Sequence, residues 1–341
     1  MYRIKQIPED FAVKEISNIK LKEKGSHGVF LLKKRNCSTP EAIELISHSL
    51  NIKNKEIGYA GNKDKEAITE QIVSIKIFND AFFEKINNLK IKNIELKFLG
   101  YSDQPISLGD LEGNSFEIII RNLDKKEINV FLKNTKMIKS NKLKIPNYYG
   151  EQRFSKNNIE IGKLILKNKI KEAIELIIEN DGFLKEKING FLENNKNNYN
   201  AALKIIPKRV LRLYIHSYQS FLWNDIVSVF LKNYKNKKNL KIPLIGFGLD
   251  LDAVKNPKLK KIIKKTLEAE KINPRDFVLK FLPELSSEGG LRNLFIKIKG
   301  FKIIKKEKDE LNKNKEKITI KFSLQKGSYA TVAVDFLFKK Q

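Results

Sequence analysis

The spacing of apolar residues differs between the two ends of this 341-residue chain and its middle. Up to about residue 123, short apolar runs rich in β-branched residues predict strands that are interrupted by two helices. The first helix, in TPEAIELISHSL, is predicted to have Thr39 as its N-cap and Pro40 at its first helical position. The predicted strands are FAVKEI (11–16), GVFLLKKR (28–35), TEQIVSIKI (69–77), IELKFLGY (94–101) and SFEIIIRN (115–122).

The C-terminal end returns to the strand pattern. ITIKFSL alternates strictly, so that every second residue from Ile318 to Leu324 shares one face. TVAVDFLF (331–338) alternates in a similar way and predicts another strand. Because one or two strands do not form a stable sheet alone, we expect the two chain ends to build one sheet together.

Between about residues 156 and 293, apolar residues recur with the helical period. In the longest predicted helix, a stripe from Leu211 through Ile215 and Tyr218 to Leu222 is typical of a core-facing side. His216 is interpreted as an ordinary polar residue rather than a catalytic acid. The clearest predicted helices are NIEIGKLILKN (158–168), IKEAIELIIEN (170–180), KRVLRLYIHSYQSFLWNDIVSVFLKN (208–233) and NPKLKKIIKKTLEAEK (256–271).

These patterns predict an α+β protein with two domains. A mixed, mostly antiparallel sheet domain would comprise residues 1–154 and 301–341, and a mainly helical domain of residues 155–300 would be inserted into it. Three Asn- and Lys-rich stretches are expected to be solvated loops or hairpin tips. They are residues 193–200, 232–239 and 305–317.

The charge of the chain favours a polyanionic partner. There are 67 Lys and Arg residues against 40 Asp and Glu, for a formal net charge of +27. Nucleic acid is the first candidate, and a membrane surface is the alternative. However, no Lys-rich stretch carries a clean apolar helical face, no run approaches the ~18 apolar residues of a membrane span, and the N-terminus lacks the apolar core of a signal peptide. We therefore expect a soluble cytoplasmic protein, whose oligomeric state the sequence leaves open.

Several kinds of chemistry are disfavoured by what the sequence lacks. The single cysteine, Cys37, excludes an internal disulfide, and three histidines form no Cys/His cluster at metal-ligand spacing, so no metal is expected. This argues against a zinc-dependent base deaminase. NKDK (62–65) is similar to the guanine-binding motif of GTPases, but the chain has no glycine-rich Walker loop to hold the phosphates, so a GTPase is not expected. A methyltransferase is not expected either, because no glycine-rich nucleotide-binding loop follows a predicted strand.

The stretch AGNKDKEAITEQ (60–71) places Asp64 between Lys63 and Lys65 after a glycine. In an isolated turn, such an aspartate would often only cap the backbone. Alternatively, the flanking lysines would keep it ionised while RNA phosphates are bound, and an ionised aspartate can act as a nucleophile or base at a sugar carbon. The residues alone therefore indicate a basic RNA-binding protein with a candidate catalytic carboxylate.

This stretch strongly resembles the signature of the TruD family of tRNA pseudouridine synthases, Ala-Gly-x-Lys-Asp-x-x-Ala-x-Thr-x-Gln. Six further blocks match the family in order along nearly the whole chain. They are PEDFAVKEI (8–16), GDLEGNSFEI (109–118), NYYGEQRFS (147–155), YIHSYQSFLWN (214–224), GGLR (289–292) and LQKGSYATVAV (324–334). The resemblance implies a pseudouridine-synthase sheet built from both chain ends, with an inserted, mainly helical TRUD domain.

The resemblance also implies an activity. A uridine in tRNA, usually the one at position 13, would be isomerised to pseudouridine without a cofactor, and the family's catalytic aspartate falls on Asp64. In such enzymes the carboxylate either attacks the ribose C1′ or removes a neighbouring sugar proton, and the sequence does not separate the two routes. The groove between the domains would be lined with Lys and Arg.

A substrate pocket follows from the same matches. A flipped uracil needs an aromatic face, and an amide side chain can pair with its polar edge. Without the motifs, the phenylalanines would be interpreted as core residues and the asparagine as a turn residue. The matched residues are Phe11, Asn114, Phe116 and Tyr329 around the nucleotide, with Lys5 and Lys63 as RNA contacts or charge balance for Asp64.

Two questions stay open at this stage. Relatives often carry Arg near Asp335 to pair with the catalytic carboxylate, so here the partner of Asp64 would be Lys63, Lys65 or another residue. Arg153 would either line the cleft or, as we favour, hold the domain junction through an ion pair with a buried carboxylate.

The rival function is a non-catalytic RNA-binding or chaperone protein that retained the fold.

Overall fold

The computed structural model describes residues 1–140, 143–155, 157–180, 182–234 and 240–339. Contacts divide the chain into two compact units. Unit 1 comprises Met1–Lys144 and Ile296–Gln341, and unit 2 comprises Ile145–Phe295. Residues 145–154, assigned to the sheet domain by the sequence analysis, belong to the second unit by their contacts. Conversely, residues 296–300, assigned to the inserted domain by the sequence analysis, belong to unit 1 by their contacts. That the second unit is an inserted domain stays a prediction.

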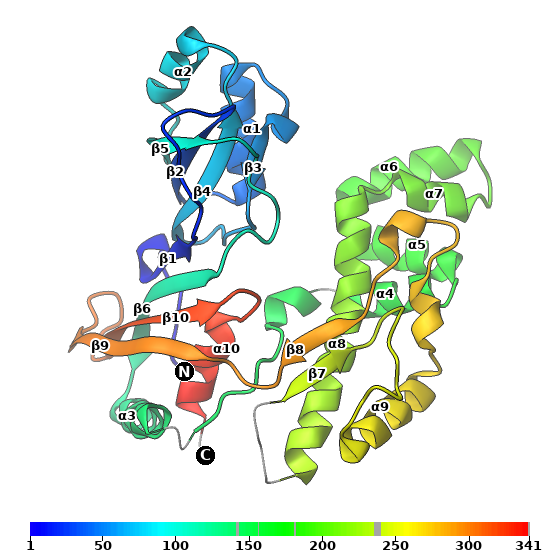
Figure 1. The fold of residues 1–341 in the computed structure, drawn as a ribbon. Coiled ribbons are helices and arrows are strands. Elements are labelled where there is room, and N and C mark those ends of the chain that lie inside the picture. The colour runs from blue at the N-terminus through cyan, green and yellow to red at the C-terminus, as the bar shows by residue number, and fades with distance from the viewer. Residues whose placement is uncertain (141–142, 156, 181, 235–239, 340–341) are drawn as a thin grey trace. The chain divides into compact units, whose positions relative to one another are not determined.

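Unit 1 is built on an eight-stranded sheet. Its strands are β1 (Phe11–Ile16), β2 (His27–Arg35), β3 (Ile57–Tyr59), β4 (Ile68–Lys76), β5 (Ile94–Ser102), β6 (Gly113–Leu123), β9 (Ile298–Lys308) and β10 (Glu316–Gln325). They run in the order β5-β2-β4-β1-β6-β10-β9, with β3 also paired to β4 (Figure 1). Among the described residues β1 and β4 pair in parallel and the other pairs are antiparallel, so the predicted mixed, mostly antiparallel sheet from both chain ends is confirmed.

The alternation of β10 is confirmed by burial. Ile318, Ile320, Phe322 and Leu324 are each at most 2% exposed, whereas Lys321 between them is exposed. On strands β2, β4 and β5, the buried face packs against α1 (Thr39–Leu50) and α2 (Asp80–Asn87). Because side chains alternate between the two faces of a strand, the buried positions show which face of each strand packs in the core.

Helix α1 begins one residue earlier than predicted, because its N-cap is Ser38 and not Thr39. The Ser38 hydroxyl accepts a hydrogen bond from the Glu41 amide at 3.3 Å, and the Glu41 carboxylate accepts one from the Ser38 amide at 2.8 Å. This reciprocal capping box satisfies two helix-terminal donors. It leaves the Thr39 hydroxyl free to form other contacts inside the protein.

The predicted strand TVAVDFLF is wrong, because these residues form helix α10 (Ala330–Phe338). The buried residues Ala330, Ala333, Val334 and Leu337 follow the helical spacing i, i+3, i+4, i+7. In an apolar run this short, the positions of the apolar residues fit both a helix and a strand, and packing against the rest of the protein decides between them. The Phe338 ring stacks on Phe131 of α3 (Lys125–Lys139), 5.3 Å between centroids, and Figure 1 shows α3 and α10 close together.

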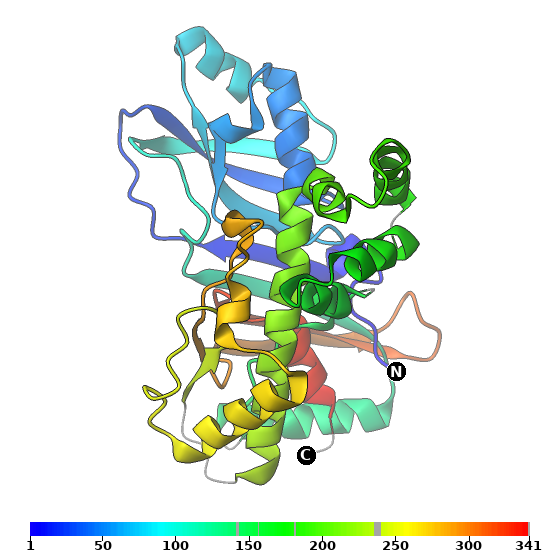
Figure 2. The same ribbon diagram turned by 90° about the vertical axis from the view of Figure 1, so that its right-hand side faces the viewer.

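Unit 2 is mainly helical, and α8 (Lys208–Asn233) runs along its length (Figure 2). The predicted core stripe is confirmed, since Leu211, Ile215, Tyr218 and Leu222 are each at most 1% exposed. The other helices are α4 (Asn158–Leu166), α5 (Ile170–Asn180), α6 (Gly182–Asn194), α7 (Tyr199–Ile205) and α9 (Pro257–Glu270). A two-stranded sheet pairs β7 (Lys241–Leu244) with β8 (Gly290–Asn293).

Two residues of unit 2 that the sequence singled out are Arg153 and His216. The Arg153 guanidinium donates to the Ser220 hydroxyl at 3.2 Å and lies 5.5 Å from the Tyr149 ring, so its described partners do not include the expected buried carboxylate. Burial lowers the pKa of His216, and the nearby charges of Arg153 and Arg212 lower it further.

The three Asn- and Lys-rich stretches differ in structure. Residues 193–200 span the end of α6 and the start of α7. In 305–317, the turn is confined to 309–315, and the flanking residues lie in β9 and β10. Of 232–239, residues 235–239 lie outside the described residues.

Candidate active site

Asp64 lies in the loop between β3 and β4, and its side chain is 38% exposed. Its Oδ2 atom is 3.3 Å from the Nζ atom of Lys5, whose side chain is 9% exposed. Lys5 comes from the N-terminal segment that leads into β1. The cationic partner that the sequence left open is therefore Lys5.

The lysines on either side of Asp64 contact other carboxylates. Lys63 is buried, and its ammonium forms an ion pair with the buried Glu15 of β1. Lys65 lies 2.7 Å from the exposed Glu41 carboxylate, and the hydrogen bond from Lys65, with those from Ser38, lowers the pKa of Glu41 to about 2. Lys63 and Lys65, predicted as possible partners of Asp64, instead neutralise the carboxylates of Glu15 and Glu41.

Asp335, the acidic residue that the sequence analysis noted near the C-terminus, lies in α10. Its carboxylate accepts a hydrogen bond from the Tyr2 hydroxyl. The acidic residue at this place therefore has a partner in the N-terminal segment.

The loop of Asp64 is held by buried side chains from neighbouring elements. The Thr39 hydroxyl accepts a hydrogen bond from the Lys63 amide at 2.9 Å and donates one to Gln71 Oε1 at 2.8 Å. Gln71 Nε2 in turn donates to the Gly61 carbonyl at 3.3 Å. Thr39 and Gln71 are both fully buried. The glutamine that closes the motif at the start of β4 thus supports the glycine turn that opens it.

A further anchor, Lys34 of β2, was not found by sequence reasoning. Its side chain is 1% exposed, and Nζ donates to the backbone carbonyls of Asp64, at 2.9 Å, and Cys37. A signal for it exists in GVFLLKKR, because Lys34 shares the inward parity of the buried Phe30 and Leu32. A lysine at such a position must find polar partners inside the protein.

Three of the predicted residues form a continuous row. The Lys5 ammonium lies 4.3 Å from the centroid of the Phe11 ring, and Phe11 meets Phe116 edge-on with centroids 6.0 Å apart. The row continues to Phe322 of β10, 5.6 Å from Phe116. Phe11 and Phe116 are 1% and 6% exposed, so most of their surface packs in the core.

Asn114 lies beside this row, opposite Glu15 of β1 and Leu324 of β10 in the strand register. Its Oδ1 atom is buried and has no hydrogen-bond partner among the described residues. Such an unpaired acceptor is uncommon in native proteins. Tyr329 is the N-cap residue of α10, four positions after Gln325, which pairs with Gly113. It therefore follows the same end of the β6–β10 pair that carries Asn114.

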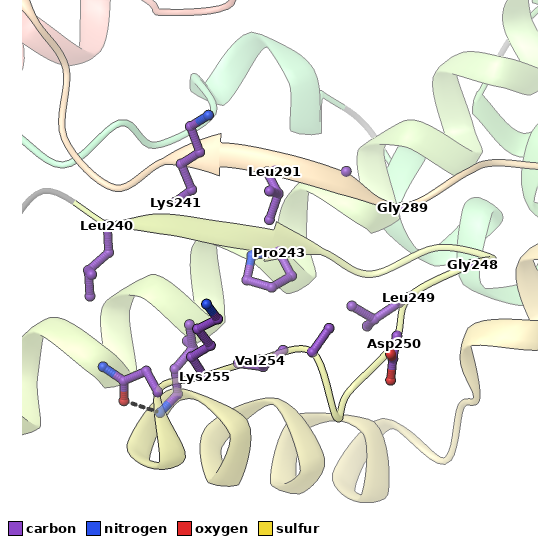
Figure 3. A pocket seen from close by; sticks show the side chains of 14 residues that line it. Leu240, Lys241, Pro243, Gly248, Leu249, Asp250, Val254, Lys255, Gly289 and Leu291 are labelled. Atoms are coloured by element: carbon purple, nitrogen blue, oxygen red, sulfur yellow. Dashed lines mark hydrogen bonds between the residues drawn. The ribbon is translucent and has the colours of Figure 1, made fainter.

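Unit 2 contains a separate pocket of about 500 Å³ between β7, β8 and the segment leading into α9 (Figure 3). Aliphatic side chains and glycines make up most of its lining, and its charged residues are Lys241, Asp250 and Lys255. None of the residues predicted to act on a nucleotide lines it. The Asp64 loop is accordingly the candidate active site.

Two further properties concern the described ranges as a whole. No helix there is both long and apolar enough to cross a membrane. In the same residues, no group of three or more His, Cys, Asp or Glu side chains is arranged to hold a metal ion.

Comparison with known proteins identifies the family of the chain. A family model described as tRNA pseudouridine synthase D (TruD) matches residues 2–189, 184–241 and 232–335. The tRNA pseudouridine synthase D of Aquifex aeolicus is 32% identical, and the probable enzyme of that name from Nanoarchaeum equitans is 30% identical, each with 98% of both chains covered. A crystal structure of a putative tRNA pseudouridine synthase D from Methanosarcina mazei matches with a TM-score of 0.70 at 25% identity, over 99% of this chain and 94% of that one. Matched along nearly its whole length, the chain belongs to the TruD family of tRNA pseudouridine synthases.

Proposed function

We propose that this isomerase converts a uridine of tRNA, the one at position 13, into pseudouridine, with Asp64 as its catalytic carboxylate. The observation that carries the proposal is a partly exposed carboxylate, 3.3 Å from the Lys5 ammonium, on a loop anchored by buried polar groups. Membership of the family supports the reaction class.

The chemistry requires one bond to be exchanged for another. The N1–C1′ bond of the uridine breaks, a C5–C1′ bond forms, and the proton on C5 is lost while N1 gains one, so no net oxidation occurs and no cofactor is required. Whether Asp64 attacks C1′ or removes a sugar proton, it acts as an ionised carboxylate. The Lys5 ammonium contributes a favourable charge interaction with that form.

The base would be recognised beside this carboxylate. The unpaired Oδ1 atom of Asn114 offers an acceptor that the N3–H donor of an extruded uracil can satisfy. Phe116 and Tyr329 would present aromatic faces to the base, and stacking of this kind contributes about 1–3 kcal/mol. Phe11 packs behind Phe116 and beneath the Lys5 ammonium, so it would hold both in position. Lys63 would help to hold the Asp64 loop in place through its ion pair with Glu15 of β1.

The charge of +27 supports tRNA as the partner, because phosphate contacts dominate the affinity of basic proteins for nucleic acids. Sequence-independent contacts of this kind bind many RNAs. Specificity would then come from the shape of the tRNA and from the extruded base. A tRNA substrate also supports a cytoplasmic location for the activity.

The direct test is incubation of the purified protein with unmodified tRNA, followed by mapping of pseudouridine. Asp64→Asn is expected to abolish the product and to leave RNA affinity within about twofold, since one carboxylate contributes little to phosphate binding. Glu66→Gln, a matched change of an exposed carboxylate in the same loop, is expected to be fully active. Normal turnover by Asp64→Asn would refute the site. Binding without any product from the unaltered protein would favour the non-catalytic RNA-binding alternative.

A further inference from the structure

Lys34 is a charged residue in a part of the sheet where charges are rarely found. It lies in β2 opposite Thr69 of β4, on the face that carries Phe30 and Leu32, and its exposed fraction is 1%. Lysine side chains usually extend their ammonium group into water, because removing the charge from water costs free energy. A lysine buried in this way therefore needs a local reason.

The partners of Lys34 are carbonyl dipoles of two separate segments. One is the carbonyl of Asp64 itself, 2.9 Å from Nζ, and the other is that of Cys37, just before the N-cap of α1. No carboxylate lies within ion-pair distance of Nζ among the described residues, although Asp64 and Glu41 act on it at longer range. The lysine thus bridges the loop to the start of α1 without a direct counter-ion.

The backbone around Asp64 is consequently held at two peptide groups, one before and one after this residue. Lys34 holds the carbonyl of Asp64, and Thr39 accepts from the amide of Lys63 on the N-terminal side. The direction of a side chain depends on the backbone that carries it. A displacement of about 1 Å in a catalytic group can slow a reaction about a hundredfold.

We propose that Lys34 is a positioning residue for the reaction, which holds the peptide of Asp64 so that its carboxylate faces the substrate. The proposal rests on the function assigned above to Asp64. Lys34 contacts the backbone of the catalytic residue and not the substrate, so its loss should change the rate and not the binding of RNA.

The test compares Lys34→Met with Lys33→Met. Methionine replaces the ammonium by an apolar group of similar length, and Lys33 is the adjacent lysine on the exposed face of the same strand. Under single-turnover conditions with saturating tRNA, we expect Lys34→Met to slow pseudouridine formation about tenfold to a hundredfold, with the Kd for tRNA changed less than twofold. Lys33→Met is expected to keep the rate of the unaltered protein.

Hydrogen exchange provides a second measurement. In Lys34→Met, amides of residues 61–66 should lose protection while those in the centre of β4 retain it, because only the loop loses an anchor. A folded Lys34→Met protein with the full rate, or with its rate reduced only in proportion to a loss of tRNA affinity, would overturn the proposal.

Should Lys34→Met not fold, Lys34→Gln provides the same comparison with an uncharged donor, and the same separation of rate from affinity is expected. If neither variant folds, Lys34 has a structural role and the proposal is overturned. The two proposals fail differently. An inactive Asp64→Asn beside a fully active Lys34→Met would refute only the role of Lys34, whereas an active Asp64→Asn would refute the proposed function.

Discussion

Four lysines around Asp64 show how the same residue type acquires different roles from its surroundings. Lys5 pairs with the carboxylate of Asp64, Lys63 pairs with a buried glutamate, and Lys65 pairs with an exposed one. Lys34 binds carbonyl groups. In a chain so rich in lysine, these roles cannot be predicted from the sequence, because each one depends on which oxygen atoms the fold places around the ammonium group.

The unpaired oxygen of Asn114 leads to a prediction about stability and activity together. Asn114→Leu replaces the amide by an apolar group of similar size. A buried acceptor without a partner costs about 1–3 kcal/mol, so the variant should be at least as stable as the unaltered protein while forming pseudouridine far more slowly. Thermal unfolding and single-turnover rates measure the two effects. Lower stability with an unchanged rate would contradict a substrate-binding role.

A second prediction at this scale concerns pH. Burial lowers the pKa of Lys34 to about 8, even though Cys37, Asp64 and Glu41 act to raise it. Between pH 8 and the ordinary value of 10.5, the unfolded chain binds more protons at this residue than the folded chain, so the contribution of Lys34 to stability rises with pH across that range. Urea unfolding of the unaltered protein and Lys34→Met at pH 7.5 and 10 should show their difference moving in favour of the unaltered protein. A pH-independent difference would indicate an ordinary lysine.

At the scale of elements, the two chain ends are joined by a buried ion cluster centred on Arg121 of β6. Its Nε atom lies 2.7 Å from Asp10, which directly precedes β1, and Nη1 lies 2.9 Å from Asp309 in the β9–β10 turn. Burial alone would raise the pKa of Asp309. Hydrogen bonds donated by Asn122 and other residues, including Arg121, outweigh this effect, so the pKa is lowered overall. The cluster therefore connects the strand that begins with Phe11 to the C-terminal hairpin.

Removal of this arginine should be severe. Arg121→Met leaves two buried carboxylates without their cation, and we expect the free energy of unfolding to fall by about 3–5 kcal/mol. Arg3→Met, at a nearby exposed arginine, should change it by less than about 0.5 kcal/mol. Chemical denaturation of both variants tests this, and similar effects from the two would contradict a special role for the cluster.

Much of the element pattern was predictable. Helix α8 and the alternation of β10 follow from periodicity alone, because long or strictly periodic segments leave little ambiguity. The eight residues of TVAVDFLF were assigned wrongly because an apolar run of that length satisfies both periods, and only packing against α3 selects the helix. The N-cap of α1 was displaced by one residue, since adjacent Ser38 and Thr39 can both cap a helix.

At the scale of the whole molecule, the charge of +27 predicts a steep salt dependence of tRNA binding. If six to ten phosphates are contacted, the affinity should fall by about 10³–10⁵ between 50 mM and 200 mM salt. Asp64→Asn should follow the same slope, because it removes no phosphate contact. Filter binding over this range provides the measurement, and a nearly flat dependence would contradict phosphate-dominated binding.

The sequence by itself determined the family, the candidate carboxylate, most of the secondary structure and the need for a polyanionic partner, because motifs, periodicity and charge are written in local residue order. The tertiary structure alone decided that Lys5 pairs with Asp64, that Gln71 and Thr39 support its loop, and that Lys34 is buried against its carbonyl. These contacts join segments that are distant in the chain. They arise from the register and order of paired strands, which local patterns leave undetermined.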